Sequence, residues 1–142
     1  MGREAKLSES LAERVRRGDR AAFGVFVGRY LAGAWSVAVR WPVGSPEQVV
    51  QRAFSELHRG PDPVVSLFSA LLKGCRQGTG ASPRDALGED LARLPEEQRE
   101  VLLLVDVAGL QISAAANILG LPTSSAAARL HRAREALGEG RG

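Results

Sequence analysis

The residues best suited to bind a charged partner lie near the end of the chain, in the segment RLHRAREAL. Arg129, Arg132 and Arg134 supply guanidinium groups, and such groups suit the phosphates of nucleic acid better than its bases. The preceding Ser124–Ala128 offers only two hydroxyls and three methyl groups. Because base readout needs donors and acceptors at the groove floor, we expect any DNA contact here to be dominated by phosphates. The alternative is that these arginines only solvate a terminal helix.

Residue types that perform catalysis or bind metals are sparse. His58 and His131 each lack a partner at metal-ligand or triad spacing. Cys75 is the only cysteine, which excludes an internal disulfide and a cysteine-rich zinc site; we expect it to be a small buried hydrophobe. The glycines form no phosphate-binding loop. The sequence therefore predicts no enzymatic activity, no cofactor and no metal site.

Composition sets the scale of the molecule. The chain has 142 residues and a formal charge of +3, with room for one ordinary domain or two small helical ones. A mildly basic balance is compatible with nucleic acid but does not establish it. We find no signal-like or membrane-length apolar run, so we expect a cytoplasmic protein that does not contact a membrane.

Three short helical runs position the basic segment. The first begins with Pro95 as its first helical residue and ends at Gly109, and the second spans Ile112–Leu119. After a tight turn, Thr123 can cap the third. Two short helices joined by a glycine-containing turn, the second of them basic, are typical of a helix-turn-helix.

The first half also predicts helices. A helix over Leu7–Arg17 precedes a second that Asp19 caps, and a further apolar run covers Leu31–Trp41. Ser45–Gln48 has the pattern of a capping box with proline at the first helical position. Asp62–Pro63 begins the next helix.

The predicted fold class is all-α, with two small helical domains at residues 1–75 and 91–142. Residues 76–90, RQGTGASPRDALGED, have the composition of a short linker. The apolar stripes predict a separate core in each domain. We expect the first core to hold Phe23, Phe26, Val50, Phe54 and Leu67, and the second Leu94, Val101, Val105, Ile118 and Leu130.

The C-terminal half resembles region 4 of the extracytoplasmic-function sigma factors of bacterial RNA polymerase. LPEEQREVLLL, the Gly109-Leu110 turn, ILGLP and RLHRAREAL carry this resemblance, and their spacing fits without a gap. RVRRGDRAAFGVFVGRYL and the helix that holds Glu47 and Gln51 resemble region 2 of the same family. Most of the chain is covered, in the family's own domain order. The resemblance implies a transcription initiation protein that directs polymerase to promoters through its helix-turn-helix.

The resemblance also implies which residues bind. In the family the third helix of region 4 enters the major groove, and the positions that match its DNA-binding set are Thr123, Ser124, Ser125, Ala127, Ala128, Arg129, Arg132 and Arg134. The polymerase clamp docks on the helix after the capping box, and the matching set is Glu47, Gln48, Gln51, Arg52 and Ser55. The implied partners are core RNA polymerase, through its β′ clamp and β flap, and promoter DNA, with an anti-sigma protein as a further candidate.

Several family residues are replaced. Gln48 stands where an aspartate is usual, Arg52 where a glutamate is usual, and Ala127 where a lysine is usual. Since exposed charge complementing a basic partner tunes association, the first two changes should weaken docking. A simpler reading is that Glu47 and Gln48 serve only the capping box.

The helix around Leu71 departs further. In the family this helix carries tryptophan, asparagine and clustered arginines, and it holds the unpaired DNA strand. Here Ser66–Arg76 contains one aromatic, Phe68, on the apolar face. Trp35 and Trp41 lie in an earlier apolar run, where we expect them to pack. The alternative function is therefore a degenerate sigma-like interaction protein, which binds polymerase, an anti-sigma or another regulator without opening DNA.

Overall fold

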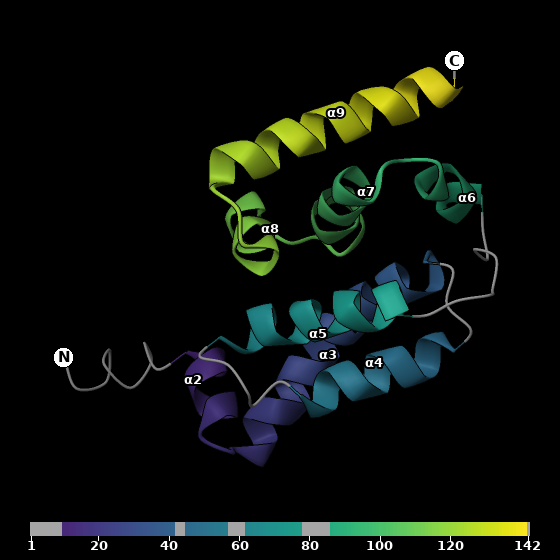
Figure 1. Ribbon diagram of the computed structural model, residues 1–142. Helices are drawn as coiled ribbons and strands as arrows, with labels where there is room; N and C mark the ends of the chain where they lie inside the picture. Colours follow the sequence, from purple (N-terminus) through teal and green to yellow (C-terminus); the bar gives the residue numbers. More distant parts are fainter. Residues whose placement is uncertain (1–9, 42–44, 57–61, 78–85, 142) are drawn as a thin grey trace.

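The computed structural model describes residues 10–41, 45–56, 62–77 and 86–141. These residues are mostly helical and contain no strand, which confirms the all-α fold class (Figure 1). In chain order the elements are α2 (Leu11–Arg16), α3 (Arg20–Val39), α4 (Pro46–Ser55), α5 (Pro63–Gln77), α6 (Ala86–Ala92), α7 (Glu96–Leu102), the π-helix η2 (Leu103–Val107), α8 (Ile112–Leu119) and α9 (Thr123–Arg141). The two predicted apolar runs of the first half form a single helix, α3.

Local capping signals set the boundaries of the first helices. The Ser45 hydroxyl accepts a hydrogen bond from the backbone N–H of Gln48 at 3.3 Å, and α4 begins at Pro46, which confirms the predicted N-cap. Asp19 caps α3 by accepting from the N–H of Ala22 at 3.1 Å. Of the helix predicted over Leu7–Arg17, α2 forms Leu11–Arg16, and residues 7–9 lie outside the described residues.

The Asp19 cap predicts a specific dependence of stability on pH. The hydrogen bond from the Ala22 N–H, followed by the bond from Arg14, lowers the pKa of Asp19 below its usual value. A carboxyl with a lowered folded-state pKa contributes stability above its unfolded-state pKa and loses that contribution as the pH falls through the folded-state value. We expect Asp19→Asn to keep the N-cap hydrogen bond but to lose the pH-dependent contribution of the carboxylate to stability. The melting temperatures of wild type and variant should converge between about pH 5 and pH 2. A constant difference over this range would contradict the prediction.

The helix predicted from Pro95 to Gly109 is not uniform. Pro95 is the N-cap of α7 rather than its first residue, and the chain widens after Leu102 into the π-helix η2. Ala108 donates to the carbonyl of Leu103, five residues earlier, at 2.8 Å. The four consecutive residues Val101–Leu104 are each at most 2% exposed. Successive residues of a helix point in different directions, so this segment is buried on more than one side.

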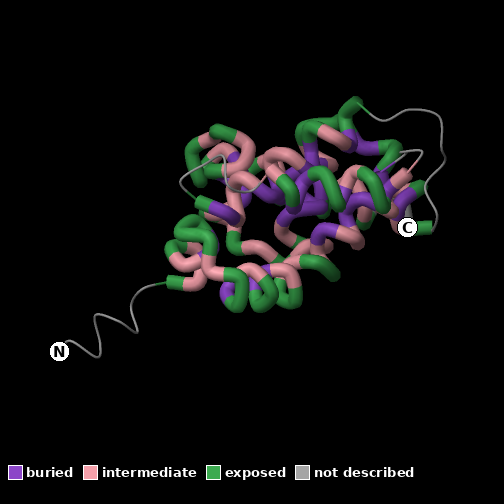
Figure 2. The backbone as a smooth tube through the Cα atoms, turned by 90° about the horizontal axis from the view of Figure 1, so that it is seen from below, coloured by how far each residue is buried: buried purple, intermediate pink, exposed green. Residues whose placement is uncertain are grey.

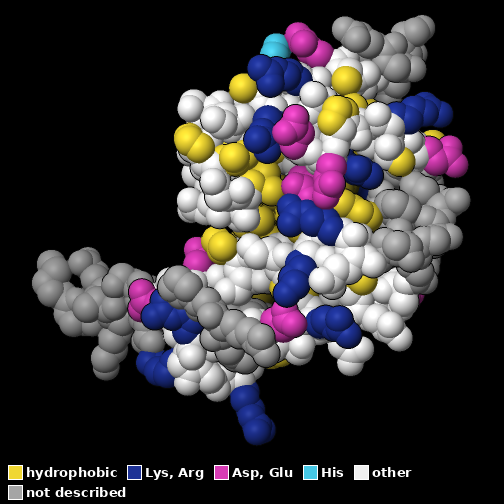
Figure 3. Space-filling model, in the orientation of Figure 1, with side chains coloured by type: hydrophobic (Ala, Val, Ile, Leu, Met, Phe, Trp, Pro, Cys, Tyr) yellow, Lys and Arg dark blue, Asp and Glu magenta, His cyan; other side chains and the backbone are white. Residues whose placement is uncertain are grey.

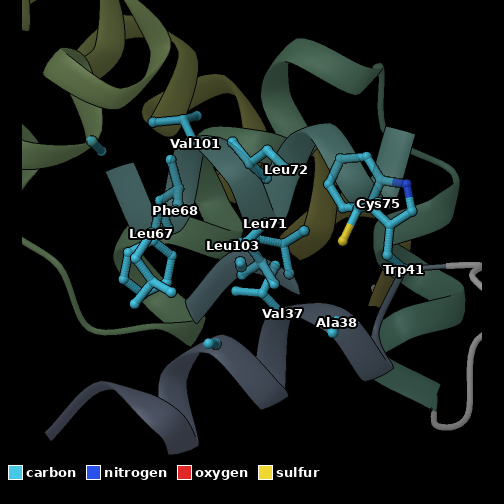
Figure 4. Packing of buried hydrophobic residues seen from close by; sticks show 14 of the residues in the cluster. Val37, Ala38, Trp41, Leu67, Phe68, Leu71, Leu72, Cys75, Val101 and Leu103 are labelled. Atoms are coloured by element: carbon cyan, nitrogen blue, oxygen red, sulfur yellow. The ribbon is translucent and has the colours of Figure 1, made fainter. Parts of the chain in front are cut away.

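The prediction of two separate cores is wrong. All the buried hydrophobic residues form one cluster that crosses from the first half to the second. Figure 4 shows Val101 of α7 and Leu103 of η2 among Leu71 and Leu72 of α5. Figure 2 shows the buried stretches in the interior and exposed turns facing outward. The two halves therefore share a core, because η2 packs on α3 while α8 packs on α5.

The predicted linker over residues 76–90 is also too long. Arg76 and Gln77 belong to α5, and Ala86–Asp90 fall within α6, while residues 78–85 lie outside the described residues. The polar composition of residues 76–90 had favoured a loop over a helix. Leu87 and Leu91 lie four residues apart on one face of α6, and Leu91 is fully buried. Burial of this short apolar stripe explains the helix.

The helix-turn-helix has the predicted order with one shift. Gly120 ends α8 in the left-handed conformation, with φ of 69°, which glycine adopts without steric cost. The carbonyl of Pro122 accepts from the N–H of Ala126 at 3.1 Å, and α9 begins at Thr123. Thr123 is thus the first residue of the helix and not its preceding cap.

By length and composition, α3 could also cross a membrane. It has 20 residues and a mean hydropathy of 1.4 over its most apolar window. The expectation that no apolar run reaches this length is therefore wrong. The core helix of a globular protein meets the same criterion, and α3 buries Phe26, Val37 and Ala38 against the other helices.

Candidate polymerase and DNA contact surfaces

The predicted polymerase-binding residues share one outward face of α4. Glu47, Gln48, Gln51, Arg52 and Ser55 are all exposed, while Val50, Ala53 and Phe54 of the same helix are buried. Gln48, Gln51, Arg52 and Ser55 line a single open hollow of about 460 Å³. The helical spacing that buries the apolar stripe is therefore the same spacing that gathers these polar side chains.

The chemistry of this α4 face is polar but carries little charge. Glu47 is the one acid among the five residues and Arg52 the one base, so their formal charges cancel. The Ser55 hydroxyl donates to the backbone carbonyl of Arg52 at 2.7 Å, so its hydrogen is already used within the helix. The Ser45 hydroxyl also donates to the Glu47 carboxylate at 3.3 Å. Glu47 thus takes part in the cap, as the simpler reading requires, and is still exposed to a partner.

The predicted DNA-binding residues divide between the outer face and the flanks of α9. Thr123, Ser124, Ala127, Ala128, Arg132 and Arg134 are exposed, whereas Ser125 and Arg129 are half-buried. The inner face of α9 buries Ala126, Leu130 and Ala133. The exposed start of the helix thus presents hydroxyl and methyl groups, and its arginines come later.

Two of the three α9 arginines predicted to bind DNA are neutralised within the same half. Arg134 holds Asp106 of η2 in a bidentate pair, with contacts of 2.6 and 3.0 Å, and this hydrogen bonding raises the pKa of Arg134. Arg129 lies 3.8 Å from the Glu97 carboxylate of α7. Among the described residues, Arg132 alone of the three has no ion-pair partner. On the face drawn in Figure 3, acidic and basic side chains are interleaved over this half.

The helix that matches the family's strand-opening helix, α5, is largely buried or half-buried. Between Pro63 and Cys75, only Lys73 of α5 is exposed. Phe68 is fully buried and meets Tyr30 edge-on, with ring centroids 6.4 Å apart. Trp41 is 6% exposed and its ring packs beneath the guanidinium of Arg99, at 4.9 Å. Neither aromatic is free to stack on an unpaired base in this structure.

Neither a reactive thiol nor a metal-binding cluster is found in the part of the chain that the structure describes, which leaves out His58. Cys75 is fully buried, and burial raises the pKa of its thiol to about 12, so the thiol is not a nucleophile near neutral pH. In the described ranges, no group of three or more His, Cys, Asp or Glu side chains could hold a metal ion.

Comparison with known proteins agrees with this architecture. Residues 84–137 match the family model described as "Sigma-70, region 4". The chain also matches a solved structure, that of CnrH in complex with the cytosolic domain of CnrY, with 26% sequence identity and a TM-score of 0.76. The match covers 91% of this chain and 93% of the CnrH chain. Residues 84–137 therefore form a sigma-70 region 4 domain, of the kind typical of extracytoplasmic-function sigma factors, and CnrH is a sigma factor of that group. No curated protein sequence matches it.

These matches confirm the resemblance that the sequence predicted. Sigma factors are transcription initiation factors rather than enzymes, and their region 4 is a DNA-binding helix-turn-helix. The structural match extends beyond the region 4 match at residues 84–137 to the first half. It therefore supports the same all-α architecture for both halves.

Sequence reasoning missed the acidic partners of α9 and the contacts between the halves. Glu97, an acid in the first turn of α7, faces Arg129 of α9. Glu100 of α7 pairs with Arg76 of α5. A possible signal was Glu100 itself, a charge beside the apolar Val101 and Leu102, because a buried carboxylate needs a cation.

Proposed function

We propose that this sigma factor docks on core RNA polymerase through the outward face of α4 and approaches promoter DNA with α9. The observation that carries the proposal is the placement of both residue sets on outward surfaces. Four of the α4 residues line one hollow, and six of the eight α9 residues are exposed. In Figure 1, α4 and α9 lie on opposite sides of the molecule, so the two contacts do not compete for one surface.

Binding to purified core polymerase tests the first contact, and Arg52 provides the variant. Arg52 is the cation on an α4 face whose family counterpart is acidic. We expect Arg52→Glu to raise the affinity for core polymerase by about fivefold, mainly through faster association. Arg93→Glu makes the same charge change in the exposed connection between α6 and α7. It should have little effect on the affinity for core polymerase. Weaker binding of Arg52→Glu, or no binding by wild type, would contradict docking through α4.

The second contact predicts weak discrimination between DNA sequences. Phosphate contacts release counterions, so affinity should fall steeply with salt. We expect Arg132→Ala to weaken binding to every duplex about equally and to lower the salt slope by about 1. Arg134→Ala should change both quantities less, because Asp106 already neutralises Arg134. Anisotropy titrations of two unrelated duplexes at several salt concentrations measure this. A changed order of preference between the duplexes would show that Arg132 reads a base.

A second function is favoured by the covered α5 helix and by the paired arginines of α9. Under this alternative the protein keeps the sigma scaffold and binds polymerase, an anti-sigma protein or another regulator without opening DNA. Tight binding of core polymerase without promoter-directed transcription would favour it.

An anti-sigma partner is part of the proposal for either function. CnrH was solved in complex with the cytosolic domain of CnrY, and the present chain matches CnrH over most of its length. We place the protein in the cytoplasm, where its polymerase and DNA partners are found. Co-purification from native cell extract tests both points.

A further inference from the structure

Helix α3 is apolar on every side, although only part of its surface is packed. Its 20 residues include two charged ones, Arg20 and Arg29, and no acid. A surface helix normally turns polar side chains outward, and a helix that is apolar all round is normally buried. Yet Val25 is 52% exposed and Leu31 is 43% exposed, and these two are the exposed large hydrophobic residues in the part of the chain that the structure describes. The outward side of α3 therefore lacks the polar residues that suit contact with water.

The exposed residues of α3 gather on one face of the helix. Positions 20, 24, 28 and 31 follow the three- and four-residue spacing that brings side chains to one side of a helix, and positions 25 and 29 lie beside them. We call this surface the α3 outer face; it comprises Arg20, Gly24, Val25, Gly28, Arg29 and Leu31. A β-carbon added to Gly24 or Gly28 would have no packing partner within 4 Å. The two glycines thus leave the backbone open, so that a second helix can approach it closely.

A hollow adjoins one end of the α3 outer face. It lies between α2 and α3, has a volume of about 450 Å³, and is lined by Val15, Gly18, Asp19, Arg20 and Phe23. Arg20 belongs to both the hollow and the outer face. The Asp19 carboxylate in the hollow is already used, because it accepts from the N–H of Ala22 and pairs with Arg14. With apolar walls from Val15 and Phe23, the hollow suits a large apolar side chain.

The charges on the α3 outer face have one sign. Arg20 and Arg29 are exposed there without an acid on the same helix. Arg16 and Arg17 are also exposed, at the end of α2 just before the hollow's Gly18. Arginine pairs with a carboxylate through a fork of parallel hydrogen bonds. A partner that carries carboxylates beside a row of apolar side chains therefore complements this surface.

We infer that the α3 outer face binds an acidic amphipathic helix of a partner protein. In this complex a large apolar side chain of the partner enters the hollow, and the partner's apolar row packs on Gly24 and Gly28. Its carboxylates pair with Arg20 and Arg29. This surface shares no residue with the α4 and α9 surfaces, so the inference does not rest on the proposed function.

Three other occupants complement this surface less well. A second copy of the chain would bring two cationic faces together. A nucleic acid base has polar atoms on its edge, and burying them in the hollow is unfavourable because the Asp19 carboxylate is already used. A bilayer would gain little apolar contact, because Val25 and Leu31 are the large apolar side chains that this face can insert.

A designed peptide tests the docking surface. The probe is a fluorescein-labelled peptide of about 18 residues, long enough to form a helix, with leucine at three- and four-residue spacing and glutamate and alanine elsewhere. The comparison peptide carries lysine in place of every glutamate. Anisotropy titration with the full chain measures both dissociation constants. We expect the glutamate peptide to bind at least about tenfold more tightly than the lysine peptide. Absence of binding by the glutamate peptide, or equal binding of both peptides, would overturn the inference.

Two variants locate the peptide, each with a matched control. Gly28→Gln fills the open backbone with a polar side chain, and Arg20→Glu places an acid in the first turn of α3, where the helix dipole favours it, so both should fold. We expect each variant to weaken binding of the glutamate peptide by about fivefold or more. Gly138→Gln on α9 and Arg93→Glu make the same changes elsewhere and should bind like wild type. Unchanged affinity in Gly28→Gln and Arg20→Glu would overturn the inference, because the peptide would then occupy another surface.

Three measurements on wild type and Gly28→Gln address the other occupants. Sedimentation detects a second copy, flotation with phosphatidylglycerol vesicles detects membrane binding, and anisotropy of a labelled oligothymidine detects nucleic acid. We expect none of these signals to differ between the two proteins. A signal present in wild type and lost in Gly28→Gln would assign the α3 outer face to that occupant and overturn the acidic helix.

Discussion

Phe68→Ala should lower the free energy of unfolding by about 3–5 kcal/mol, the usual cost of removing a large buried aromatic side chain. Phe68 is fully buried and its ring meets Tyr30 edge-on. It lies in the cluster shared by both halves, so the loss should appear in one common transition and not in a transition of the first half alone. Urea unfolding followed by circular dichroism measures the change.

Val25→Ala provides the matched control for this experiment. Val25 lies on α3 with 52% of its surface exposed, so its truncation should change stability by less than about 0.5 kcal/mol. Two separated transitions, with only one displaced by Phe68→Ala, would show that the halves unfold independently. A loss below about 1 kcal/mol would show that Phe68 is not a core residue.

Features that depend on a few neighbouring residues could be predicted from the sequence. Asp19 and Ser45 cap helices because their side chains reach an N–H three residues later. Gly109 and Gly120 have positive φ, as expected of residues that end helices. The exposed face of α4 also follows from local periodicity, since Val50, Ala53 and Phe54 fix which side is buried.

Features that depend on the other half could not be predicted in this way. Two consecutive leucines are equally compatible with a helix that is buried on one side and with one that is buried on two. Leu103 and Leu104 therefore gave no local indication of the widened turn of η2. The pairing of Arg76 with Glu100 joins residues 24 positions apart. Likewise, nothing in the sequence indicates an ion-pair partner for Arg134. The pair with Asp106 forms because the fold places α9 beside η2. These contacts alter the expected function most, because they concern the helices that we propose to face DNA.

Promoter opening is where the two candidate functions give the most different results. A sigma factor that opens DNA must stabilise unpaired bases, and stacking on an aromatic side chain contributes about 1–3 kcal/mol per base. In the described part of α5 the one aromatic, Phe68, is buried, and Trp41 is covered by Arg99. The charged residues of α5 that could hold a DNA strand are limited to Lys73 and Arg76.

We therefore expect this protein with core polymerase to initiate poorly on closed duplex and at least about tenfold better on a template with a pre-opened bubble. A pre-opened bubble removes the free-energy cost of melting, which the missing stacking contacts do not offset. Two missing contacts account for more than a tenfold effect on the rate.

Run-off transcription with purified components on matched templates measures the ratio, and core polymerase alone on the bubble template is the control. Equal and robust output from both templates with wild type would show that the protein opens promoters unaided, and the degenerate alternative would then be wrong.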